Sequence, residues 1–157
     1  MCLGISILRR QINAELLAEF ALQRSLFSRA DGADDELIFK FNDPVPRLPV
    51  MHDGQMHIYT WGNRDDRQSR LPKTGWCRTE SLEVGKWRYL SPEPCEIPAV
   101  AGLEKGVWFQ IKEGIQGVVV HDEHEQSHVY MLTQPASHYY QVMTRHERMP
   151  VLIGQVI

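Results

Sequence analysis

The sequence predicts a single α+β domain dominated by antiparallel strands. Three observations support this prediction: the length of 157 residues, the 43% of hydrophobic residues, and short apolar runs separated by turn residues. A chain of this length can bury a core on its own. No apolar run is long enough to form a membrane-spanning helix, so we expect no membrane partner.

The N-terminal part favours two strands and a helix. Residues 3–8 predict a short strand. Asn13 is suited to cap a helix over 14–29, where leucine and phenylalanine recur at helical spacing. Residues 31–35 predict a turn, and 37–41 predict the next strand.

The following segment is expected to form a hairpin. Residues 43–49 contain three prolines, which remove donors from a strand ladder, so we expect an extended surface segment rather than a central strand. His52 to Gln55 predicts a turn between Val50-Met51 and the strand 56–61. Residues 62–75 are polar and predict a loop.

The second half predicts more strands and two helices. A helix is expected from about Ser81 to Tyr89. A short helix is expected from Gln134 to Thr144, because proline and serine near its start favour helix initiation. Further strands are expected at 97–100, 107–112, 117–121 and 129–133, with a turn at Glu113-Gly114.

Charge and cysteine content narrow the classes of function. The formal charge of −3 disfavours a protein that binds nucleic acid through a globally positive surface. Residues 61–90 nevertheless hold seven basic and four acidic side chains, which allows either a local basic face or an ordinary mixed surface. Three cysteines without a secretion signal indicate a reducing compartment, and we expect a cytoplasmic protein.

Two places in the sequence could carry chemistry. If Met1 is removed, Cys2 presents an α-amine beside a thiol, and such a 1,2-aminothiol condenses with an aldehyde to a thiazolidine. The alternative is a small residue that begins a strand. His146 is the best candidate for proton transfer near neutral pH, although a single histidine is more often structural.

Together with the intermediate motifs, these two places resemble the SRAP (SOS response-associated peptidase) family. Its animal members shield abasic sites in single-stranded DNA. The family's Met-Cys start and its H-x-R-M-P motif are similar to Met1-Cys2 and His146–Pro150. The intermediate landmarks follow in the family's order: Phe41-Asn42-Asp43-Pro44, Trp61-Gly62, Trp76–Ser81, Cys95–Ala99 followed by Glu104, and Tyr130–Ala136.

The resemblance implies one SRAP-like domain over residues 1–157, a curled antiparallel sheet or barrel with a few short helices. Several positions depart from the family's pattern: Trp76 replaces the asparagine of N-A-R, Leu3 replaces a glycine, and Leu103 and Lys105 replace aromatic residues. The chain also stops at Ile157, where most relatives continue. These departures fit a short, divergent member, truncated at the C-terminus and of phage or prophage origin.

The resemblance also implies a function. Cys2 would trap an abasic site in single-stranded DNA as a thiazolidine, with Glu104 and His146 moving protons. The DNA would be contacted by Arg64, Trp76, Arg78 and Arg148. Weak abasic-site lyase activity and N-terminal self-processing are also implied, and we expect no cofactor, no metal and a monomer.

Three alternatives accompany this interpretation. Trp76 and the short C-terminus could leave a scaffold that binds single strands or a protein partner without cross-linking. The tryptophans could be core residues rather than base-stacking ones, and Glu104 a solvated turn residue. The histidines and acidic residues of segment 121–128 could bind a metal, but flanking strands favour a polar hairpin loop.

Overall fold

The computed structural model describes residues 2–20, 26–27, 35–68 and 70–155. Within them, five strands close into a barrel in the order β10 (Ile115–His121), β7 (Glu93–Ile97), β4 (Arg47–His52), β5 (Gln55–Trp61) and β11 (Ser127–Pro135). The closing contact is the antiparallel pairing of β11 with β10, and only the β5–β11 contact in the barrel is parallel. The prediction of a mostly antiparallel, curled sheet or barrel is therefore confirmed.

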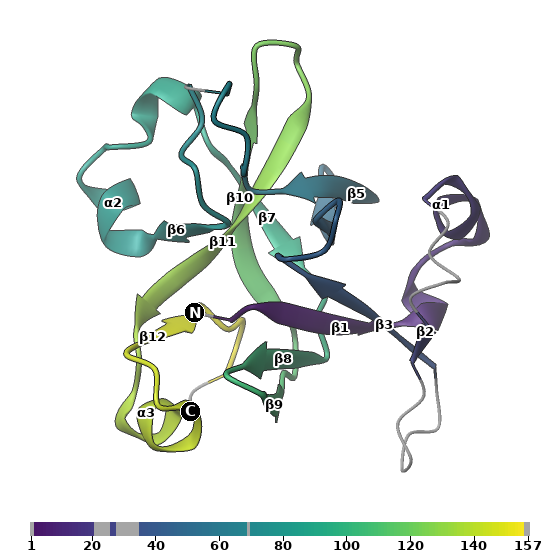
Figure 1. Cartoon of the computed structure of the whole chain (residues 1–157), viewed down its shortest axis with the longest axis vertical. Helices are drawn as coiled ribbons and strands as arrows, with labels where there is room; N and C mark the ends of the chain where they lie inside the picture. Colours follow the sequence, from purple (N-terminus) through teal and green to yellow (C-terminus); the bar gives the residue numbers. More distant parts are fainter. Residues whose placement is uncertain (1, 21–25, 28–34, 69, 156–157) are drawn as a thin grey trace.

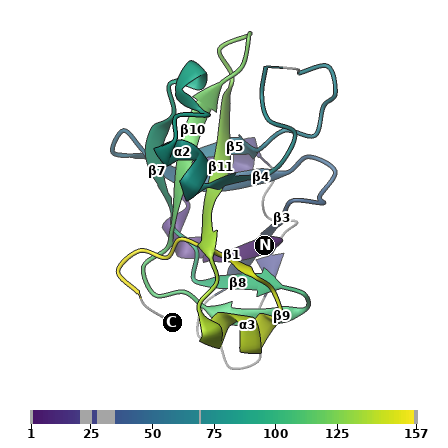
Figure 2. The ribbon, with the colours of Figure 1, turned by 90° about the vertical axis from the view of Figure 1, so that its left-hand side faces the viewer.

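Strand β11 is long enough to serve two purposes. Its first half belongs to the barrel, and its second half pairs with the short strands β6 (Trp76–Arg78) and β12 (Arg148–Pro150). Figure 2 shows β11 running from its hairpin with β10 to the level of α3 (His138–Thr144). As a result, β11 brings together Trp76–Arg78 and Arg148–Pro150, which lie far apart in the sequence.

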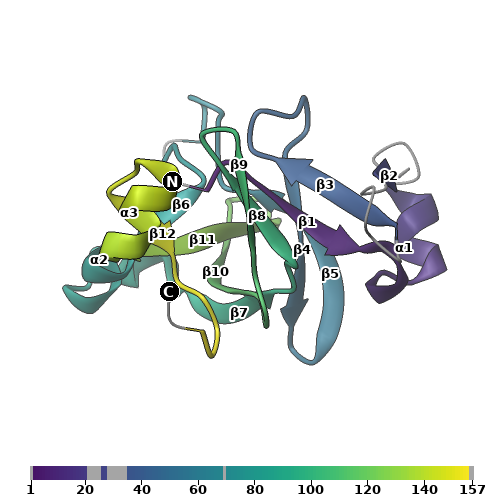
Figure 3. The ribbon, with the colours of Figure 1, turned by 90° about the horizontal axis from the view of Figure 1, so that it is seen from below.

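A second, antiparallel sheet lies against the barrel. Its order is β2 (Leu26–Phe27), β3 (Glu36–Lys40), β1 (Gly4–Leu8), β8 (Ala101–Glu104) and β9 (Val107–Gln110). Helix α1 (Ala14–Glu19) and β2 lie toward one end of this sheet, whereas β12 and α3 lie toward the other (Figures 1 and 3). The start of β1 lies near β12 (Figure 1).

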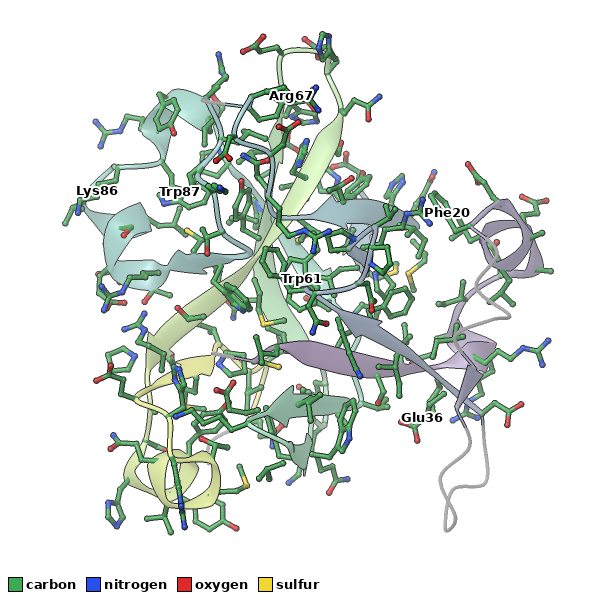
Figure 4. The ribbon with its side chains drawn as sticks, in the orientation of Figure 1. Phe20, Glu36, Trp61, Arg67, Lys86 and Trp87 are labelled. Carbon is green, nitrogen blue, oxygen red and sulfur yellow. The ribbon has the colours of Figure 1, made fainter. Side chains whose placement is uncertain are left out.

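Two apolar clusters hold these layers together. The larger one joins both sheets, with Ile5 and Leu37 from one and Val50 and Val119 from the other, all fully buried. The smaller cluster lies beneath α2 (Thr79–Glu83) and is built around Trp87. Each such side chain contributes about 1.5–3 kcal/mol through burial. Figure 4 shows Trp61 near the middle of the molecule and Lys86 at its edge.

The N-terminal predictions hold in part. Asn13 caps α1, because its side chain accepts a hydrogen bond from the backbone of Leu16. The helix ends at Glu19, so the expected extension to residue 29 is wrong where Leu26–Phe27 form β2. Residues 21–25 and 28–29 of that extension and residues 31–34 of the predicted turn lie outside the described residues.

The proline-rich segment departs from its prediction. Arg47 to Pro49 belong to β4, a strand in the wall of the barrel. Trp61 donates its backbone N–H to the Pro46 carbonyl. Because hydrogen-bonded and non-hydrogen-bonded pairs alternate along an antiparallel ladder, Pro49 and Ile58 form a pair that exchanges no backbone hydrogen bonds. Proline therefore loses no hydrogen bond to β5, which is why it is tolerated there.

In the second half of the chain, the strands predicted at 107–112, 117–121 and 129–133 are confirmed in outline. The boundaries of other elements differ from the prediction. The helix expected over 81–89 is instead α2 followed by the 3₁₀ turn η3 (Arg88–Leu90), because Gly85 with a φ of +81° interrupts it. Gln134 belongs to β11, and the last helix begins only after its cap, Ser137.

Other strands also begin and end at residues different from those predicted. The strand expected at 97–100 is replaced by β7, which ends at Ile97, and β8, which begins at Ala101. The 3₁₀ turn η1 (Arg9–Gln11) and β12 were not anticipated. The turn at His52–Gln55 is confirmed, with Asp53 and Gly54 at positive φ. In the described part of the chain, no helix is long and apolar enough to cross a membrane.

Candidate functional site

Cys2, Glu104 and His146 come together although they are far apart in the sequence. Strand β1 pairs with β8 in the register Gly4 to Leu103, and Cys2, just before β1, lies close enough to Glu104 for its charge to act on the thiol. The loop after α3 brings His146 Nε2 to 3.8 Å from Glu104 Oε1. Cys2 and Glu104 are buried, and His146 is partly exposed. The three residues expected to be catalytic thus share one site.

The backbone and thiol of Cys2 are both held in place. Its Sγ lies 3.0 Å from the Gly4 carbonyl oxygen and donates to it, and its own carbonyl accepts from the Trp76 indole N–H at 3.1 Å. Burial raises the pKa of the Cys2 thiol to about 12, and the charge of Glu104 adds to the shift. The thiol is therefore neutral near pH 7, and a reaction at sulfur must move its proton.

An aromatic cluster lies next to Cys2 through Trp76. The ring centroid of Phe41 lies 4.9 Å from that of Trp76 and 5.5 Å from that of Trp61. Trp76 is 9% exposed, so its ring is mostly covered by protein. Trp76 therefore lies next to Cys2, and it supports that residue rather than presenting an open face to a base.

The orientation of His146 follows from its neighbours. The backbone N–H of Arg148 donates to Nδ1 at 3.0 Å, and an amide N–H can only donate, so Nδ1 accepts and Nε2 carries the proton of the neutral ring. The Arg148 carbonyl lies 3.2 Å from the same Nδ1. The Nε2–H therefore lies on the side of the ring that faces Glu104.

The Arg148 guanidinium forms its hydrogen bonds within the protein. It donates to both carboxylate oxygens of Glu80, at 2.7 and 3.1 Å, and to the carbonyl and hydroxyl of Thr133. The hydrogen bonds from Arg148 lower the pKa of Glu80 to about 2. This arginine therefore links β12, β11 and α2, and few of its N–H groups remain to bind a phosphate.

The other two expected DNA-contacting arginines are exposed. Arg64 lies over the ring of Phe41, 5.8 Å from its centroid, and donates to the Pro44 carbonyl. Arg78 ends β6, with its guanidinium 3.8 Å from Glu80. Part of the basic segment is neutralised locally, because Arg67 pairs with Asp65 and Lys73 with Asp66.

Sequence reasoning missed Tyr140. This residue of α3 is fully buried and packs edge-on against Phe109, with ring centroids 5.3 Å apart. Burial raises the pKa of its phenol, and the neighbouring Cys2 and Glu104 raise it further. A short helix with two adjacent tyrosines gives no sequence signal for which of them faces the site, since Tyr139 is exposed.

The metal alternative at residues 121–128 is a hairpin loop instead. His128 contacts the Gly62 carbonyl through Nδ1 and Asp122 through Nε2, so both ring nitrogens are occupied. Among the described residues, the metal-type side chains that do cluster are His52, Asp53 and Glu93. Two of them, His52 and Asp53, line a cavity of about 730 Å³ bordered by β4, β7 and β10, and Cys2 is not part of its lining.

The comparisons with known proteins identify the fold. A crystal structure of a protein from Bacteroides thetaiotaomicron superposes with a TM-score of 0.67 at 15% identity, covering 98% of this chain and 78% of that one. A crystal structure of a Bordetella bronchiseptica protein has a TM-score of 0.54 at 16% identity, covering 96% and 83%. The sequence matches no protein-family model and no curated protein. The fold of this chain is therefore also found in these two solved structures.

Proposed function

We propose that this chain traps abasic sites in single-stranded DNA through a thiazolidine on Cys2. The observation that supports the proposal is the convergence of Cys2, Glu104 and His146 from three distant parts of the chain. These are the residues to which the resemblance to the SRAP family assigns the chemistry. The exposed Arg64 and Arg78 would bind the phosphates of the strand.

The reaction uses both functional groups of Cys2 after removal of Met1. The α-amine adds to the C1′ aldehyde of the ring-opened sugar, and the resulting carbinolamine loses its hydroxyl as water to give an imine. The sulfur then forms a bond to the same carbon, and the thiol proton passes to the imine nitrogen. One aldehyde and one aminothiol thus yield one thiazolidine and one water.

The neighbouring residues supply proton transfer. His146 donates the Nε2 proton to the leaving hydroxyl, since Nδ1 is occupied by the Arg148 amide. It takes up the proton that the carbinolamine nitrogen loses as the imine forms, so the ring returns to its starting state. Glu104 accepts the proton of the neutral thiol and returns it to nitrogen. Because the imine also acidifies the adjacent sugar carbon, weak β-elimination of the strand would accompany trapping.

An adduct assay tests the proposal. Protein confirmed by mass spectrometry to lack Met1 is mixed with a single-stranded oligonucleotide carrying one abasic site. We expect a gel-stable product with the combined mass less one water, absent with Cys2→Ala and with undamaged DNA. Cys95→Ala, which removes another buried thiol, is the matched control and should react normally. No adduct from the processed protein would refute the covalent mechanism.

A non-covalent role is the second candidate, and two observations favour it. The Cys2 thiol is fully buried and Trp76 occupies the position of the family's asparagine. In that case the processed chain binds single strands without forming an adduct. A Trp76→Asn variant separates the two roles, because an adduct formed only by this variant would show that Trp76 has switched off the reaction.

A further inference from the structure

A second opening lies directly beside His146. This cavity has a volume of about 490 Å³ and is lined by Lys105, Gln141, Arg145, His146 and Glu147. Lys105 comes from the turn between β8 and β9, whereas Arg145 ends α3. His146 therefore faces Glu104 through Nε2 and also forms part of the wall of a pocket reached from solvent.

The backbone at the two basic positions is unusual. Lys105 has a φ of +47° and Arg145 a φ of +59°, both in the left-handed region. Lys105 occupies the first position of a two-residue turn followed by Gly106, where asparagine or glycine is preferred. Arg145 closes a helix where glycine is preferred. At both positions a long cation stands where a small residue would be easier to accommodate, which points to a role for the charge.

The two cations are held together at the rim. The Lys105 ammonium donates to the Arg145 carbonyl at 2.8 Å, which joins the β8–β9 turn to the end of α3. An ammonium has three protons, so two remain for a ligand. The Arg145 guanidinium forms no ion pair with any described residue. With Glu147 as the one carboxylate in the lining, the pocket has a formal charge of +1 when His146 is neutral.

We propose that this pocket binds a backbone phosphate of the DNA strand next to the reacting sugar. The inference rests on the function proposed above and adds the place where the strand is held. Arg145 offers a planar fork suited to two phosphate oxygens, and Lys105 adds a point charge. A phosphate here places the adjoining sugar near His146, which lines the pocket and whose Nε2 faces Glu104.

Non-covalent binding tests the pocket without the reaction. In a Cys2→Ala background, the affinity for a single-stranded oligonucleotide is measured by fluorescence anisotropy over a range of salt concentrations. Arg145→Gln and Lys105→Gln should each weaken binding about ten-fold at low salt. Each should also reduce the slope of log affinity against log salt by about 0.7. Glu147→Gln should strengthen binding, because it removes the opposing carboxylate.

Lys86→Gln is the matched control, since it removes one exposed cation that lies at the edge of the molecule (Figure 4) and does not line the pocket. Its affinity should remain within about two-fold of the parent. Equal effects of Lys86→Gln and Arg145→Gln would overturn the inference, because they would indicate only a diffuse charge effect. Thermal melting of each variant verifies that the fold is intact.

A second probe separates this inference from the proposed reaction. Inorganic phosphate is titrated into the Met1-processed protein while the His146 ring is followed by NMR. Saturable shifts that disappear in Arg145→Gln would support a phosphate site even if no covalent adduct forms. Saturable phosphate binding without any effect of Arg145→Gln on DNA affinity would overturn the assignment to the DNA backbone. Absence of both responses would overturn the site altogether.

Discussion

At the scale of single residues, Trp76 is the side chain that most determines how Cys2 is presented. Its indole N–H donates to the Cys2 carbonyl, and its ring packs against Phe41 and Trp61. A buried carbonyl that loses its donor is costly, because water cannot replace the hydrogen bond. Trp76 therefore couples the position of a reactive residue to the stability of the core.

Replacement of Trp76 by phenylalanine tests this coupling. We expect Trp76→Phe to lower the free energy of unfolding by about 1–3 kcal/mol beyond the effect of lost volume, because the Cys2 carbonyl loses its partner. Trp87→Phe is the control, since Trp87 is buried against Tyr130 in the other cluster. Urea denaturation gives the energies, and alkylation of Cys2 followed by mass spectrometry should accelerate only in Trp76→Phe. Equal labelling in both variants would contradict the coupling.

At the scale of elements, the loop after β5 depends on one glycine. Gly62 has a φ of +60°, its N–H donates to the Val129 carbonyl, and a Cβ there would overlap the carbonyl of Thr74. The same residue accepts from His128 through its own carbonyl. The Trp61-Gly62 pair is thus a requirement of backbone packing between β5, β11 and the loop that follows.

We expect Gly62→Ala to be much more destabilising than a substitution at a comparable open position. Gly54 also has positive φ, at +75°, but a Cβ there meets nothing within 4 Å. Gly54→Ala should therefore cost about 1 kcal/mol, from the backbone alone, whereas Gly62→Ala should exceed about 2 kcal/mol because of the added overlap. Denaturant midpoints measure both, and similar losses would rule out the packing argument.

At the scale of the whole molecule, burial sets the response to alkaline pH. Burial raises the pKa of Cys2, Cys77 and Cys95 from 9.0 to about 12, and it also raises the pKa of Tyr130 and Tyr140. The folded state therefore holds these protons more tightly than the unfolded chain. The associated stability is fully present below about pH 9 and is lost as the pH rises toward about 12.

We expect the urea midpoint to fall progressively from pH 9 to about pH 11 in the presence of a reductant. Cys95→Ala should show a smaller fall than the unsubstituted protein, because one of the raised thiols is removed. A midpoint that stays constant over this range would indicate that the thiols are accessible in the folded state. Circular dichroism at each pH follows the transition.

Much of the fold and part of the site were accessible from the sequence. The hairpin turn at Asp53-Gly54 and the cap Asn13 depend on neighbouring residues, so local pattern identified them. The strand at Arg47–Pro49 was not anticipated, because whether a proline disrupts a strand depends on which side its missing N–H faces. That side is set by the register with β5, which is a tertiary property.

The sequence alone determined the chemical types present in the candidate site, namely an aminothiol, a carboxylate and an imidazole in a fixed order. Only the tertiary structure decided their roles: Cys2 is buried and held by Trp76, Arg148 is taken up by Glu80, and Lys105 meets Arg145 beside His146. The physical reason is that burial and pairing arise from strand register and sheet packing between distant segments, since the partners in these three contacts are 74, 68 and 40 residues apart.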